Sequence, residues 1–168
     1  MRTMRELHLN STNSPLSSLV HHLQEDKLNV DPPYQRGSVW GTDRCLALIK
    51  SVTIGLPIGS IFISERPFPE WPVVLDGKQR LLTLRGWMEN KLLVPSAWFE
   101  DREIDIYDEF VRWDMLSDTG RRRWENQALV QVYWSSFRGS LEEIERQEKE
   151  LFDLINFGGV PQGESDEV

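Results

Sequence analysis

The 168-residue chain has one cysteine, three histidines and no apolar run long enough to cross a bilayer. A lone Cys45 cannot form an internal disulfide, and the opening MRTMRELHLN lacks the apolar segment of a signal peptide. We therefore expect a cytoplasmic protein with no membrane partner. Its length suffices for one ordinary domain with its own core.

Positive charge is also scarce, because 19 Lys and Arg stand against 27 Asp and Glu, for a net charge of −8. This excludes a surface that coats nucleic acid by charge alone. The excess is concentrated in residues 142–168, which hold nine acidic and two basic residues. The pattern predicts a solvated helix face followed by an acidic tail at 163–168, whereas residues 1–162 form a single domain that can still contain local cationic sites.

The sequence does contain 39% hydrophobic residues and seven tryptophans, enough to anchor a folded core. No internal repeat is found. Apolar periodicity and turn residues predict helices alternating irregularly with short strands, hence an α+β fold. The predicted helices cover 14–28, 43–54, 78–90, 116–127 and 141–155, and the predicted strands cover 59–64, 72–76, 91–95, 102–107 and 128–134.

Several helix ends carry capping residues. Ser14 or Ser17 is expected to cap the first helix, and Thr42 the second. Ser140 with Glu143 has the spacing of a capping box for the last helix, and the Gly158–Gly159 pair is expected to end it.

One short stretch, DGKQR at 76–80, joins a predicted strand to a predicted helix. A helix start offers unpaired N–H groups and the positive end of the helix dipole, and Gly77 lets a phosphate approach the backbone. Lys78 and Arg80 add positive charge, and Asp76 is placed to hold Mg²⁺ or to orient a water. An ordinary Asp-Gly turn with surface cations is the alternative interpretation.

Other candidate sites are weaker. Residues 121–123 are three arginines beside Trp124, a combination that can grip and stack a nucleic acid, although three charges at a helix start are more often solvated. Cys45 falls on an apolar helix face and is expected to be a small core residue. The histidines, His8, His21 and His22, form no pattern typical of a metal site.

Four segments together resemble a known family. PPYQRGSVW (32–40), GLPIGSIFI (55–63), VVLDGKQRLLTL (73–84) and LFDLINFGGVPQ (151–162) are similar, in this order, to the motifs of the N-terminal domain of GmrSD-type restriction enzymes, which carry a DGQQR signature. This resemblance implies a ParB/sulfiredoxin-like fold, with a small mixed sheet flanked by helices, and nucleotide hydrolysis in defence against phage DNA. It also implies a bacterial host, with the gene carried by the bacterium or by a phage.

The signature falls on Asp76, Gly77, Gln79 and Arg80, and the upstream motif on Gln35 and Arg36. Lys78 replaces the usual Gln and keeps a hydrogen-bond donor. No cysteine lies in residues 77–80, which excludes sulfiredoxin chemistry. The HNH nuclease domain of GmrSD-type enzymes has no counterpart among the three histidines, so we expect no HNH-type cleavage by residues 1–168.

The resulting hypothesis is a module that binds and hydrolyses a nucleoside triphosphate with Mg²⁺. Asp76, Arg80 and Arg36 are the predicted catalytic residues, with Asp76 as the metal ligand. The predicted phosphate ligands are Gly77, Lys78, Gln79, Arg80 and Gln35. DNA or a nuclease protein is the further partner that the resemblance implies, and no signal indicates an oligomeric state. Two alternatives stay open: a non-catalytic DNA- or protein-binding module, and a ParB-like enzyme that nicks or modifies DNA.

Overall fold

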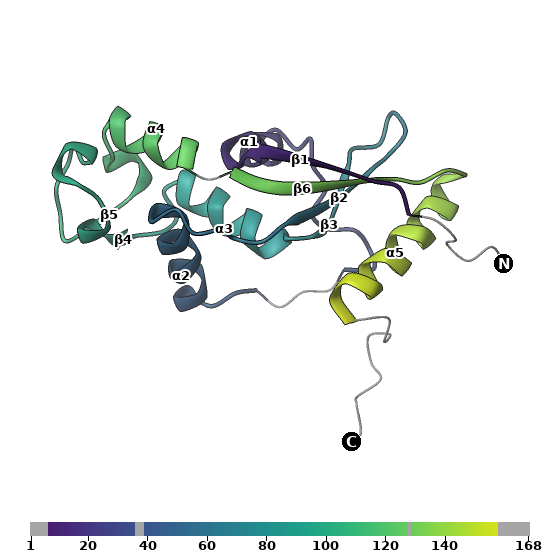
Figure 1. Ribbon diagram of the computed structural model, residues 1–168. Coiled ribbons are helices and arrows are strands. Elements are labelled where there is room, and N and C mark those ends of the chain that lie inside the picture. The colour runs from purple at the N-terminus through teal and green to yellow at the C-terminus, as the bar shows by residue number, and fades with distance from the viewer. Residues whose placement is uncertain (1–6, 36–38, 128, 158–168) are drawn as a thin grey trace, which may run out of the picture.

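The computed structural model describes residues 7–35, 39–127 and 129–157, which form a mixed α+β fold (Figure 1). The strands are β1 (Leu9–Pro15), β2 (Ile61–Glu65), β3 (Val73–Asp76), β4 (Val94–Pro95), β5 (Phe110–Val111) and β6 (Leu129–Ser136). The α-helices are α1 (Leu16–Gln24), α2 (Thr42–Thr53), α3 (Lys78–Met88), α4 (Asp118–Gln127) and α5 (Leu141–Phe157). Within these ranges no helix has the length and apolar character needed to cross a bilayer.

Four strands form the central sheet in the order β1-β6-β2-β3. Strand β6 runs antiparallel to β1 and parallel to β2, and β2 runs antiparallel to β3. The predicted α+β class with a small mixed sheet is therefore confirmed. The sequence does not predict β1, because the five residues between Leu9 and Pro15 are all polar; it is an exposed edge strand held by its pairing with β6.

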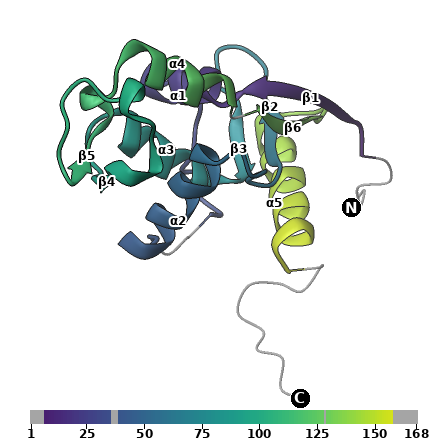
Figure 2. The same ribbon diagram turned by 60° about the vertical axis from the view of Figure 1, so that its left-hand side comes forward.

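The two faces of the sheet pack on different helices (Figure 2). Val74 of β3 belongs to the main core with α1, α2 and α3, whereas its neighbours Val73 and Leu75 pack with Leu151 of α5. Successive residues of a strand point to opposite faces, so the short strand β3 is buried on both sides. Its sequence VVLD is accordingly a continuous apolar run up to Asp76.

The predicted helices α1, α2 and α3 are confirmed, and the apolar residues of their stripes are buried except Cys45 and Met88, which are partly buried. Cys45 lies half-buried at the edge of α2, with its Sγ 3.4 Å from the Thr83 hydroxyl. Among the tryptophans, Trp87, Trp113 and Trp124 form an edge-to-face series with ring centroids 5.9 and 5.4 Å apart. This series fastens α4 and the β4–β5 lobe to α3.

One predicted strand is absent. Residues 102–107 do not form an edge strand: a 3-10 turn covers Asp101–Glu103, and Ile104 makes only an isolated bridge to Leu116. The alternation misleads here because the polar Glu103 is the buried residue, and it is ion-paired with Arg123.

The helix starts also differ from the prediction at two places. Thr42 is the first residue of α2 and follows Gly41 at the cap position, and Pro15 precedes α1 without any side-chain cap among the described residues. The capping box of α5 is confirmed: Ser140 N donates to Glu143 Oε2 at 2.8 Å, and Glu143 N donates to Ser140 Oγ at 3.3 Å. These bonds lower the pKa of Glu143. The Gly158–Gly159 stop lies outside the described residues.

A buried ion pair fastens α5 to the sheet. Arg66, directly after β2, donates through Nε to Glu148 Oε1 at 3.0 Å and through Nη2 to Glu148 Oε2 at 2.5 Å. The Glu148 side chain is fully buried and that of Arg66 is 4% exposed. Tyr34 also donates its hydroxyl to Glu148 Oε2, at 3.1 Å. Burial, followed by the charge of Glu148, raises the pKa of Tyr34.

We predict that Arg66→Ala lowers the free energy of unfolding by about 3–5 kcal/mol, because it leaves the Glu148 carboxylate buried without its cation. Urea denaturation measures this loss. Lys149→Ala is the matched control on the same helix: its partner Asp153 is 2.7 Å away, but Lys149 is 54% exposed, so we expect a change of at most about 0.5 kcal/mol. Equal small losses in both variants would contradict a structural role for the buried pair.

Candidate functional site

Strand β3 and helix α3 meet at Gly77, which is buried and has a left-handed backbone with φ of +100°. A Cβ built on this glycine would lie 2.2 Å from the Ile61 Cδ1 atom. Both the backbone angle and the lack of space therefore require glycine at this position. The predicted order of strand, hinge and helix is confirmed, with the hinge at residue 77.

The start of α3 presents unpaired backbone donors. The first i to i−4 hydrogen bond of the helix runs from Leu81 N to the Gly77 carbonyl at 3.0 Å, so the amides of Lys78, Gln79 and Arg80 precede the ladder. No side chain in the described part of the chain caps them. The positive end of the helix dipole and these amides thus lie together at the hinge.

Arg80 and Asp76 form one unit across the hinge. Arg80 Nη2 donates to Asp76 Oδ2 at 2.8 Å, and Nη1 donates to the Ile58 carbonyl at 2.8 Å. Gly59 leaves room for this guanidinium, because a Cβ there would lie 2.7 Å from Nη1. The Asp76 side chain is 31% exposed and that of Arg80 is 16% exposed. The two predicted catalytic side chains therefore contact each other and the loop before β2.

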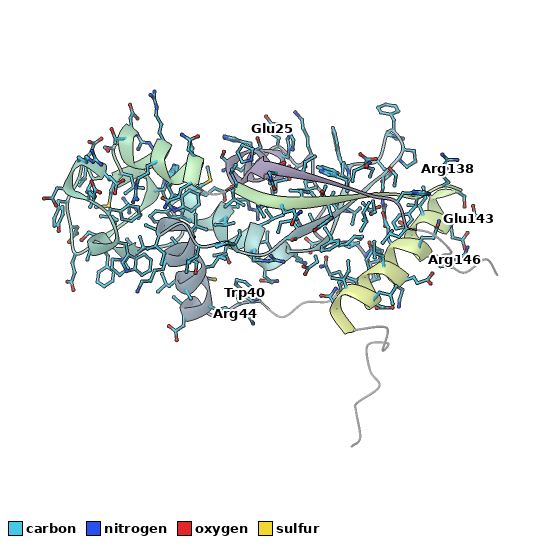
Figure 3. The ribbon with its side chains drawn as sticks, viewed as in Figure 1. Glu25, Trp40, Arg44, Arg138, Glu143 and Arg146 are labelled. Atoms are coloured by element: carbon cyan, nitrogen blue, oxygen red, sulfur yellow. The ribbon has the colours of Figure 1, made fainter. Side chains whose placement is uncertain are left out.

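Lys78 and Gln79 are held by other segments. Lys78 is ion-paired through Nζ with Asp31 Oδ1, and its side chain is 14% exposed. Gln79 Oε1 accepts a hydrogen bond from the Trp40 amide at 3.3 Å. The Arg44 guanidinium lies over the Trp40 ring, 4.5 Å from its centroid, in a cation–π contact. Figure 3 shows the two side chains together beside the start of α2.

The upstream motif also reaches the hinge. Gln35 Nε2 donates to the Leu75 carbonyl at 3.4 Å, one residue before Asp76. Its Oε1 is buried and accepts no hydrogen bond from the described residues. Arg36 lies outside the described residues, so its predicted role stays a prediction.

Sequence reasoning missed three contributors to this site: the Asp31 carboxylate, the Ile58 carbonyl and the Trp40 amide. Two of them are backbone groups, which carry no residue signature. The only available signal was the repeated glycine of GLPIG, since Gly59 has φ of +83° and lies against Arg80.

The three arginines at 121–123 and Trp124 do not form a nucleic-acid site in which Trp124 stacks on a base. Trp124 is 1% exposed and cannot stack a base. Arg121 donates to the Leu116 carbonyl at 2.6 Å and to Asp118 Oδ1 at 2.7 Å, and Arg123 pairs with the buried Glu103. Two of the three arginines thus hold α4 to the preceding turns.

Comparison with protein families gives a match to the description "GmrSD restriction endonuclease, N-terminal domain" over residues 16–168. The chain belongs to this family. No curated protein and no solved structure matches it, so the ParB/sulfiredoxin likeness of the fold and the boundary at residue 162 stay predictions. Membership gives the chain a restriction and phage-defence context.

We predict that Gly77→Ala destabilises the fold by about 2–4 kcal/mol, because a left-handed residue with a Cβ is strained and the methyl group would displace Ile61. Gly86→Ala is the matched control on the same helix: its Cβ would meet nothing closer than 3.9 Å, and the change should stabilise α3 by about 0.5–1 kcal/mol. Urea denaturation of both variants tests the pair. A tolerated Gly77→Ala would show that the hinge can relax.

Proposed function

We propose that the β3–α3 hinge binds the phosphates of a nucleoside triphosphate and that the chain hydrolyses it. The observation that carries this proposal is the start of α3, which no described side chain caps, and which is opened by a left-handed Gly77 and flanked by Lys78 and Arg80. A buried glycine next to free amides at a helix start is the arrangement that lets phosphate oxygens approach a backbone.

The cations at the hinge are available to an anion. Arg80 uses two N–H groups in the described contacts, and a guanidinium has five, so the remaining donors can turn to a phosphate. The Asp31 side chain that pairs with Lys78 is 77% exposed, so its carboxylate stays hydrated if another anion takes its place. A phosphate can therefore replace Asp31 as the partner of the Lys78 ammonium.

The donor set at the hinge fits Mg²⁺ bound together with a nucleotide. The described residues contain no group of three or more His, Cys, Asp or Glu side chains that could hold a metal ion. Mg²⁺ in nucleotide sites takes one or two carboxylates and completes its shell with phosphate oxygens and waters, so Asp76 alone is a sufficient protein ligand. Bound there, the ion would neutralise negative charge on the phosphates.

The protein groups around the hinge have distinct roles in this proposal. Gly77 and the following amides hold the phosphates, and Lys78, Arg80 and Arg36 neutralise charge that develops on them. The second Asp76 oxygen, which is outside the Arg80 pair, would hold the ion or orient the attacking water. Gln79 and Gln35 orient oxygens of the ligand.

The first test is Arg80→Ala. We expect its affinity for nucleoside triphosphate to fall about 10- to 100-fold, the scale of a lost hydrogen bond between charged groups. Its melting temperature should fall as well, because the bonds to Asp76 and to the Ile58 carbonyl are lost. Calorimetric titration well below both melting temperatures separates the two effects.

Arg80→Lys should restore only part of the affinity, since one ammonium cannot span two oxygens. Arg112→Ala is the control, because Arg112 forms an exposed pair with Asp114 3.3 Å away and lies outside the hinge. Unchanged affinity in Arg80→Ala would move the phosphate site elsewhere.

The second test is Asp76→Asn. The amide can still accept the hydrogen bond from Arg80, so binding should stay within a few-fold, whereas phosphate release should fall at least about 100-fold. Asp114→Asn serves as the exposed control. Equal phosphate release by Asp76→Asn and the unmodified protein would reject the catalytic role, and binding without any release would favour a non-catalytic nucleotide switch.

A further inference from the structure

A groove of about 490 Å³ runs beside α3 on the Lys78 side. It is lined by Leu82 and Arg85 of α3, by Asp26 and the segment 28–31, and by residues 70 and 71 of the loop before β3. None of the predicted site residues lines it, although its volume is in the range of small-molecule pockets.

The groove adjoins the hinge through Asp31. Asp31, which lines it, is the ion-pair partner of Lys78, the first residue of α3. The segment 28–31 is tied alongside β3, because Asn29 N donates to the Pro72 carbonyl and Val74 N donates to the Asn29 carbonyl, both at 2.8 Å. At about 3.3 Å per strand residue, the six residues from Gly77 back to Trp71 span at most roughly 20 Å. An extended nucleoside triphosphate whose terminal phosphate lies at Gly77 is comparable in length.

The two ends of this path differ in chemistry. The hinge end has Lys78, Arg80 and the first amides of α3. The groove itself is lined by the carboxylates of Asp26 and Glu70, the indole of Trp71 and Arg85, whose charge is paired with Glu89 at 3.9 Å. Carboxylates repel phosphate but accept hydrogen bonds from ribose hydroxyls and from base N–H groups. The path therefore suits a ligand with an anionic end and a hydrogen-donating, aromatic end.

Trp71 is placed to stack such an aromatic end. Its side chain is 52% exposed, whereas Trp87, Trp113 and Trp124 are buried in the main core. The loop that presents it is fixed on both sides: Arg66 is anchored in the buried pair with Glu148, Val73 is fully buried, and Glu70 N donates to the Pro67 carbonyl at 3.0 Å. An exposed aromatic on a rigid loop loses little conformational entropy on binding.

We propose that this groove holds the base and ribose of the nucleotide, with the base stacked on Trp71 and the carboxylates of Asp26 and Glu70 receiving its hydrogen bonds. The inference rests on the proposed phosphate site at the hinge. Stacking of a base on an aromatic side chain is a substantial interaction that every base can make.

The experiment compares each of the four ribonucleoside triphosphates with inorganic tripolyphosphate, which has no base or ribose, by calorimetric titration in Mg²⁺. We expect the unmodified protein to bind at least one nucleotide about 10-fold or more tighter than tripolyphosphate. Trp71→Ala should remove this difference and leave the tripolyphosphate affinity unchanged, and Trp71→Phe should keep most of it. Phe68→Ala is the control, because Phe68 is 97% exposed on the same loop and does not line the groove.

Each outcome decides between the two proposals. Nucleotide affinity that is unchanged in Trp71→Ala, or that equals tripolyphosphate affinity in the unmodified protein, overturns the groove inference while the phosphate site stands. If Trp71→Ala weakens tripolyphosphate binding as much as nucleotide binding, the groove inference is also overturned, because the substitution would then act on the phosphate site and not on the base. Absence of binding by all five ligands overturns both proposals.

Discussion

The reversal of the chain at Gly77 is the constraint on which the rest of this structure depends. A left-handed residue without a side chain lets β3 end against Ile61 and lets α3 turn back along the sheet. The same turn places Lys78 and Arg80 on different sides of the helix start, where each meets a separate segment of the chain. The fold and the candidate site therefore share one backbone geometry, and this is the position where a change of residue affects both.

The sequence was informative where local chemistry decides the structure. The apolar runs of β2 and β3, the stripe of α3 and the capping box at Ser140 follow from short-range rules, and the strand-to-helix hinge was found with them. Prediction from the sequence failed where contacts with distant parts of the chain stabilise an element. The polar β1 exists only because β6 offers it hydrogen bonds, and Glu103 is buried only because Arg123 comes from another helix.

The candidate site divides in the same way. Its charged residues could be named from the sequence because they stand together between an apolar run and a helical stripe. Their partners could not: Ile58 and Trp40 contribute main-chain atoms, and Asp31 is an ordinary surface residue until the fold brings it to Lys78. The family match adds the restriction context, which no single interaction in the structure carries.

The bond between Tyr34 and Glu148 has a consequence for the behaviour of the whole chain. Tyr34 directly precedes Gln35, which contacts the strand end at the hinge, while Glu148 belongs to the helix on the other face of the sheet. Lifting α5 from the sheet would leave the half-buried phenol without its acceptor, so the loop before Gln35 and the seating of α5 are thermodynamically linked. Linkage is reciprocal. A ligand that orders the loop also stabilises the packing of α5 on the sheet, and a change that weakens this packing also destabilises the loop that contacts the hinge.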